Sequence, residues 1–153
     1  MNKNIQEIAY ELQNRFLDEN FVVQRYDSYS TKSIYLKLDY GVAKSIRISD
    51  HVGYNYLSYR YNVRLDIDKS YKETDKRGFL RYYFSPNDLD KLVNHILDLR
   101  KKQIEAIGEF RYSLKVTQYL EQNSGSKGFW RKCKVVRRKN NDVKWITTRY
   151  KIW

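Results

Sequence analysis

The sequence predicts an α+β protein, in which an antiparallel sheet is covered by two helices and is followed by a basic C-terminal β-hairpin. Two stretches carry apolar residues at three- and four-residue steps, which is the period of a helix. Several short runs alternate apolar and polar residues, which is the period of a strand. Aromatic residues make up 16% of the chain, a composition that favours sheets. The length of 153 residues fits one domain with an appendage.

The two helices are expected at residues 4–16 and 87–108. The second has a clear start signal, because Ser85 is a favoured helix cap and Pro86 is favoured at the first helical position. Residues 110–120 fit both periods, since they alternate as a strand would and also place apolar residues on one helical face. We interpret this segment as a helix.

Five strands are expected before the second helix, at residues 21–26, 33–39, 44–49, 59–67 and 79–84. The second and third are joined by the turn signal Tyr40-Gly41 and therefore predict a hairpin. The fourth has the clearest alternation, because its odd positions are all apolar or aromatic and its even positions are all polar. Residues 68–78 are expected to form a polar loop.

Residues 123–128, Asn-Ser-Gly-Ser-Lys-Gly, are the one flexible-looking stretch. They divide the chain into a core domain, residues 1–122, and a basic aromatic β-hairpin, residues 129–153. In that hairpin, strands at 130–138 and 143–152 flank a polar turn.

The net charge of +12 is concentrated at the C-terminus. Residues 127–153 hold ten Lys and Arg residues against one acid, whereas residues 1–110 hold eighteen against sixteen. Clustered cations raise the local potential and release counterions from phosphate. This asymmetry predicts a surface that contacts a polyanion, such as nucleic acid or a ribonucleoprotein.

Tryptophan side chains lie among these cations, as base stacking combined with phosphate contact requires. The expected nucleic-acid or partner-binding residues are Lys127, Trp130, Arg131, Lys132, Lys134, Arg137, Arg138, Lys139, Lys144, Trp145, Arg149 and Lys151. The alternative is that the tryptophans pack onto the core domain and the cations keep an edge hairpin soluble. We favour polyanion contact, because a merely soluble edge normally mixes charge signs.

No catalytic motif is apparent, and we expect no enzyme activity, no cofactor and no bound metal. Cys133 is the only cysteine, which excludes an intrachain disulfide and a thiolate zinc site and points to a reducing compartment. A magnesium-dependent nuclease is a distant alternative, based on the carboxylates Asp66, Asp68, Glu73 and Asp75. Solvated acids on a strand and loop are the favoured interpretation.

A second motif, Arg47, Ser49, Asp50 and His51, ends the expected strand at 44–49. An Asp beside a His can tune a general base, yet adjacent strand residues point to opposite faces and no nucleophile is implied. We favour a turn in which Ser49 and Asp50 bond nearby backbone amides and His51 bonds a carbonyl. His51 stays a candidate site residue.

Several features resemble small anti-CRISPR proteins carried by phages and mobile elements of Gram-positive bacteria, which inhibit the single-protein type II RNA-guided effector nuclease. The resemblance covers about half of the chain. It comprises a Ser/Tyr-rich strand with Ser28-Tyr-Ser30 and Tyr35, the run Ile46-Arg-Ile-Ser-Asp-His51, an alternating strand that ends near residue 67, and the helix at 87–107 leading to Phe110-Arg-Tyr112. The related run in that family reads Ile-Arg-Leu-Ser-Asn-His, so Asp50 replaces an Asn.

The resemblance implies a stoichiometric, phage-encoded inhibitor that binds the effector nuclease or its guide RNA in the cytoplasm of a bacterial host. The basic arm of that family is N-terminal, whereas here it is C-terminal, so the mode of inhibition does not carry over. The alternative is a phage regulator that binds DNA or RNA directly. No membrane partner is expected, because the start of the chain lacks the apolar core of a signal peptide and no apolar run is long enough to span a bilayer.

Overall fold

The structure is a computed structural model that describes residues 4–28, 32–51, 59–124 and 134–136, with the side chains of 121–124 and 134 left aside. Its described elements are, in chain order, α1 (Ile5–Asp18), β1 (Val23–Asp27), β2 (Ile34–Leu38), the 3-10 turn η1 (Asp39–Gly41), β3 (Ser45–Ser49), β4 (Tyr61–Arg64), β5 (Tyr71–Thr74), β6 (Leu80–Phe84), the 3-10 turn η3 (Pro86–Asp88), α2 (Leu89–Ile107), α3 (Glu109–Ser124) and β7 (Lys134–Val135). The α+β class is therefore confirmed. The second strand of the expected C-terminal hairpin lies outside the described residues.

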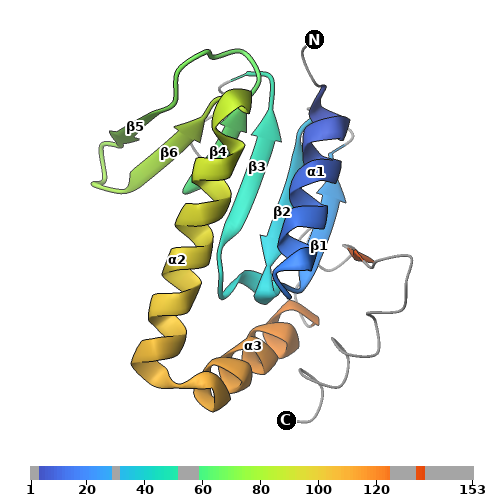
Figure 1. Ribbon diagram of the computed structural model, residues 1–153, viewed down its shortest axis with the longest axis vertical. Helices are drawn as coiled ribbons and strands as arrows, with labels where there is room; N and C mark the ends of the chain where they lie inside the picture. The colour runs from blue at the N-terminus through green and yellow to red at the C-terminus, as the bar shows by residue number, and fades with distance from the viewer. Residues whose placement is uncertain (1–3, 29–31, 52–58, 125–133, 137–153) are drawn as a thin grey trace.

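The described strands form one sheet in the order β5-β6-β4-β3-β2-β1-β7. Most neighbours are antiparallel, including the predicted hairpin of β2 and β3, in which Ile34 pairs with Ile48 and Leu36 with Ile46. The pairs β3–β4 and β4–β6 are parallel, which the sequence analysis did not predict. Helices α1 and α2 cover one face of the sheet, and α3 lies beyond its end (Figure 1).

The main core lies between the sheet and the helices α1 and α2. Ile8, Leu12 and Phe16 of α1 are fully buried, as their helical spacing predicts. They meet Leu36 and Ile46, two of the alternating residues on the facing side of the sheet. Helix α1 begins with a capping box, in which the Asn4 side chain accepts from the Glu7 amide and the Glu7 side chain accepts from the Asn4 amide.

Three predicted elements differ in extent. The strand expected at 59–67 is confined to β4, because the chain turns after Arg64. The expected loop at 68–78 contains β5, an exposed edge strand whose polar sequence carries no alternation signal. The segment at 110–120 is helical, as predicted, and belongs to the longer helix α3.

The second face of the sheet carries polar and tyrosine side chains, and several of them are buried. Arg47 and Asn62 lie there, paired across β3 and β4, and their residues are 1% and 0% exposed. The Asn62 Nδ2 donates to the carbonyl oxygens of Tyr59 and Tyr82, at 2.6 and 3.2 Å. Alternation thus identifies the faces of the strands correctly, but it does not predict that polar residues on this face are buried.

A smaller core joins α3 to the turn η1, and the buried carboxylate of Asp39 lies within it. Tyr112 of α3 donates a hydrogen bond to Asp39 Oδ2 at 2.5 Å, and Arg100 Nε of α2 lies 3.0 Å from the same oxygen. The amide of Val22 donates to Asp39 Oδ1 at 3.0 Å. One carboxylate therefore connects both later helices to the start of β1.

Arg100 has further contacts that fix its position. Its guanidinium donates to the carbonyl oxygens of Glu19 and Asn20, at 3.0 and 3.1 Å, and lies 4.0 Å from the centroid of the Phe21 ring. Burial raises the pKa of Asp39, and the nearby Arg100 charge opposes that rise. Burial and the adjacent Asp39 raise the pKa of Tyr112, which keeps the phenol protonated as a donor.

Replacing Asp39 is expected to lower the stability of the fold strongly. Asp39→Ala should reduce the free energy of unfolding by about 3 kcal/mol or more, since Arg100 would lose its buried counter-charge. Tyr112→Phe removes one hydrogen bond and should cost about 1.5–3 kcal/mol. Denaturant unfolding of the purified variants measures both values.

The matched control is Asp90→Ala. Asp90 also pairs with an arginine, Arg15, but its side chain is 83% exposed, so its loss should cost less than about 1 kcal/mol. Equal effects of Asp39→Ala and Asp90→Ala would contradict the structural role given to Asp39.

Candidate nucleic-acid interface

Of the twelve predicted binding residues, the structure describes Lys134, and the other eleven lie outside the described residues. Lys134 begins β7, which pairs antiparallel with β1 and places Lys134 opposite Arg25. The amide of Val136 donates to the carbonyl of Val23 at 2.7 Å. Residues 134–136, which belong to the basic C-terminal segment 127–153, are thus paired with β1.

Apolar packing supports this attachment. Val135 packs against the smaller core that contains Tyr112 and Val116 of α3, and Val136 packs against the main core. Helix α3 runs to Ser124 and so includes the first two residues of the predicted break at 123–128. The division into residues 1–122 and 129–153 stays a prediction.

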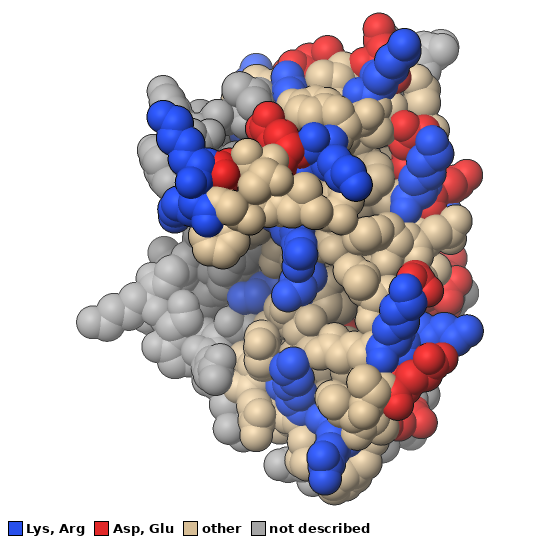
Figure 2. All heavy atoms as spheres, turned by 90° about the vertical axis from the view of Figure 1, so that its left-hand side faces the viewer, with Lys and Arg blue, Asp and Glu red and all other residues tan. Residues whose placement is uncertain are grey.

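Elsewhere on the described surface, charges of both signs are interspersed. Figure 2 faces the side formed by β5, β6 and α2 and shows Lys and Arg side chains alternating with Asp and Glu along the helical edge. Ion pairs formed by residues of α2 include Asp90 with Arg15 of α1 at 2.7 Å and Lys102 with Asp98 at 2.9 Å. This mixed side is typical of an ordinary solvated surface.

The motif Arg47, Ser49, Asp50 and His51 forms a local hydrogen-bond network at the end of β3. Ser49 Oγ donates to the carbonyl of His51 at 2.8 Å, and Arg47 Nη1 approaches the same carbonyl at 3.4 Å. His51 Nδ1 lies 3.0 Å from Asp50 Oδ1, and Arg47 Nη2 lies 3.2 Å from His51 Nε2. These contacts gather around the carbonyl and ring of His51, just after the end of β3.

This geometry accounts for the motif without catalysis. A carboxylate accepts hydrogen bonds, so the contact with Asp50 places a proton on His51 Nδ1 and leaves Nε2 to accept from Arg47. The lone pair that a general base would use is therefore engaged. Ser49 is fully buried, and its hydroxyl donates to the His51 carbonyl. The contacts differ from those expected from sequence: Ser49 bonds a carbonyl and not an amide, Asp50 bonds a ring nitrogen, and the His51 ring contacts Asp50 and Arg47 and not a carbonyl. The expected turn itself extends into residues outside the described ranges.

Arginines engage two of the carboxylates considered for a metal site. Arg64 binds Asp66 with two contacts of 3.0 and 2.6 Å, and this pairing lowers the pKa of Asp66. Arg81 binds Asp75 at 2.9 Å and is the first cause that lowers the pKa of Asp75 to about 2. Within the described ranges, no group of three or more His, Cys, Asp or Glu side chains is arranged to hold a metal ion.

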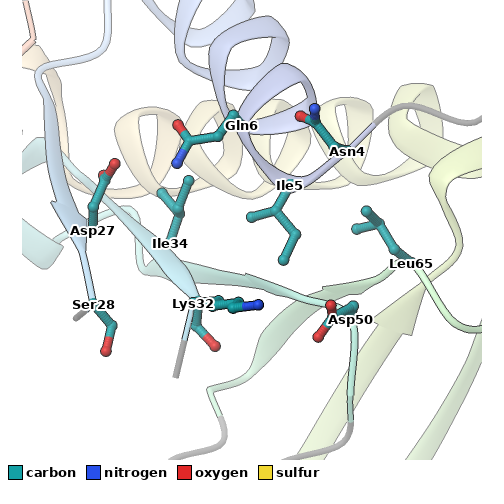
Figure 3. A pocket seen from close by; sticks show the side chains of 10 residues that line it. Asn4, Ile5, Gln6, Asp27, Ser28, Lys32, Ile34, Asp50 and Leu65 are labelled. Carbon is teal, nitrogen blue, oxygen red and sulfur yellow. The ribbon is translucent and has the colours of Figure 1, made fainter. Parts of the chain in front are cut away.

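A hollow of about 450 Å³ lies between the start of α1 and the nearby ends of the strands (Figure 3). Ile5, Ile34 and Leu65 provide apolar walls, and Asp50 and Lys32 lie at the polar side of the hollow. Its size is within the range of small-molecule pockets. Sequence reasoning missed it, because its residues come from five separate segments.

No protein-family model matches the chain, and no significant match is found among curated proteins or solved structures. The resemblance of the Ile46–His51 run to anti-CRISPR proteins therefore stays a prediction. Among the described residues, no helix is both long enough and apolar enough to cross a membrane.

Substitutions of Arg47 and His51 should show whether this motif stabilises the fold or binds a ligand. Arg47→Ala should lower the free energy of unfolding by about 2 kcal/mol or more, because a buried, hydrogen-bonded side chain is removed. His51→Ala should cost less than about 1 kcal/mol, since its side chain is 46% exposed. Thermal unfolding and oligonucleotide binding by fluorescence anisotropy measure both properties. If His51→Ala abolished binding while the protein stayed folded, His51 would belong to the interface.

Proposed function

We propose that this protein is a non-enzymatic binder of nucleic acid or a ribonucleoprotein, which it contacts through residues 127–153. One observation carries the proposal: this segment holds ten cations against one acid, while residues 1–110 are nearly neutral. Such a segment gives strong, salt-dependent attraction to phosphate. The pairing of β7 with β1 supports the proposal, because it places the backbone of one of these cations, Lys134, in the folded sheet.

The geometry of the candidate catalytic groups favours binding over chemistry. Arg47 contacts the nitrogen of His51 that would accept a proton, and Asp66 and Asp75 are held by arginines. A carboxylate that is paired with an arginine already has its counter-charge and is poorly suited to bind Mg²⁺. These contacts support the proposal that the protein acts by binding its target and not by catalysis.

A more specific proposal follows from the resemblance described above. The protein would be a phage-encoded anti-CRISPR inhibitor, whose basic segment binds the guide RNA or an acidic surface of a type II effector nuclease. In that arrangement, the Arg47–His51 network is part of the scaffold and the basic segment provides the contact. A phage regulator that binds DNA or RNA would use the same segment without the effector.

Removing charge beyond β7 should weaken binding to nucleic acid. A variant that replaces Arg137, Arg138, Lys139 and Lys144 by Gln keeps Val135 and Val136, and with them the packing of β7. The plot of log affinity against log salt should become shallower by about 0.7 for each single-strand phosphate contact that is lost. Anisotropy titrations over a series of salt concentrations provide the measurement.

The matched control replaces four exposed cations outside the segment by Gln, at Lys69, Lys91, Lys101 and Arg111. Both variants have the same net charge, so a general effect of charge would lower the nucleic-acid affinity of both equally. The proposal expects the control to keep most of its affinity and its salt slope. Equal losses in the two variants would contradict a localised interface.

The proposal that the protein is an anti-CRISPR inhibitor is tested by measuring target cleavage with a purified type II effector and guide RNA. Cleavage should fall in proportion to the added protein until the effector is saturated, because a stoichiometric inhibitor does not turn over. The variant with four substitutions beyond β7 should inhibit less than the control variant. Unchanged cleavage across several type II effectors would contradict the inhibitor proposal and leave only the proposal of a general nucleic-acid binder.

A further inference from the structure

The β5–β6 hairpin lies at the edge of the sheet opposite β7 and projects away from the helices (Figure 1). All four residues of β5 are exposed. The tip of the hairpin, residues 75–79, reads Asp-Lys-Arg-Gly-Phe. Sequence reasoning treated residues 68–78 as a loop and did not consider this tip as an interaction surface.

The Asp75 carboxylate holds the tip in a fixed shape. Its Oδ1 accepts from the amides of Arg77 and Phe79, at 2.9 and 3.0 Å, and its Oδ2 accepts from Arg81 Nη2 at 2.9 Å. Gly78 completes the turn with a φ of 88°, a left-handed conformation that glycine adopts without strain. The Asp75 carboxylate is thus bonded within the turn, and its charge is offset by Arg81 and by Arg77, whose Nη2 lies 3.6 Å from Oδ2.

The side chains at the tip combine an exposed aromatic ring with cations. Phe79 is 59% exposed, and the guanidinium of Arg77, whose side chain is 67% exposed, lies 5.2 Å from its ring centroid. Lys76 and Lys72 are also exposed. Residues 71–81 hold four cations against two acids, so the hairpin is positive overall.

A purely structural role explains part of this pattern. Lysine on an edge strand prevents pairing with other chains, which accounts for Lys72. It does not account for the combination of the exposed Phe79 ring with the exposed guanidinium of Arg77 beside it. Aromatic rings beside cations are the combination that binds single-stranded nucleic acid, in which bases stack on the rings and phosphates meet the cations.

We propose that Lys76, Arg77 and Phe79 form a second contact for single-stranded nucleic acid, with an unpaired base stacked on Phe79 and neighbouring phosphates near Lys76 and Arg77. This inference rests on the proposed function for its class of ligand. The tip and β7 are on opposite edges of a seven-stranded sheet, roughly 29 Å apart at the usual strand spacing. A strand that reaches both contacts binds more tightly than either contact alone provides.

Phe79→Ala tests the proposal in the full-length protein. The probe is a fluorescein-labelled oligo(dT) strand of about 20 nucleotides, compared with a blunt duplex of the same length. Loss of one stacked base should weaken binding of the single strand roughly tenfold, with little effect on the duplex, whose bases are already stacked. Phe79→Trp keeps an aromatic face and should restore the affinity.

Phe110→Ala is the matched control, since Phe110 is 61% exposed and lies on α3. It should leave both affinities unchanged. Replacing Lys76 and Arg77 together by Gln should make the salt slope for the single strand shallower by about 1.4. Unchanged single-strand affinity in Phe79→Ala, or an equal loss for single strand and duplex, would overturn the inference.

A failure of the tip contact can be distinguished from a failure of the proposed function. If the variant with four substitutions beyond β7 binds as the parent does while Phe79→Ala loses single-strand affinity, the tip contact stands and the role of residues 127–153 falls. If that variant loses affinity and Phe79→Ala does not, the tip contact falls and the proposed function stands.

Discussion

The buried carboxylate of Asp39 is the constraint on which the arrangement of the other elements depends. It receives hydrogen bonds from Tyr112 and from the Val22 amide and pairs with Arg100, so that α2, α3 and the start of β1 meet at one point. An isolated buried charge is costly, but one with a counter-charge and several donors is stable in a single geometry. The requirement to satisfy Asp39 therefore determines where α3 lies.

The position of α3 has consequences for the proposed interface. The small core around Tyr112 and Val116 of α3 also receives Val135 of β7, which pairs with β1. The same core that contains Asp39 thus anchors the strand at which the basic segment joins the sheet. In the proposed function, this contact links the stability of the fold to binding.

Local patterns predicted much of the fold, because helices and hairpins are specified by neighbouring residues. The capping signal at Ser85 and the apolar period after it predicted α2, and the alternation of β2 and β3 predicted their pairing. The parallel pairs on either side of β4 depend on residues far apart in the chain, and no local period encodes them. The sequence predicted Asp39 only as the last polar residue of the strand at 33–39, because its partners Arg100 and Tyr112 lie more than 60 positions later.

The candidate site was predictable to a smaller degree. Charge counting proposes residues 127–153 as a binding segment, which stays a prediction, and the general rule for turns did not predict the hydrogen-bond partners of the Arg47–His51 motif. The tip of the β5–β6 hairpin was missed because exposure of Phe79 depends on where the edge of the sheet lies.

Amide hydrogen exchange of the full-length protein, with and without a saturating single-stranded oligonucleotide, tests the central claim most directly. The account predicts slower exchange in the bound state from residue 134 onward, with α1 and α2 unchanged. Slower exchange confined to α1 or α2, with residues 134–153 unaffected, would contradict it.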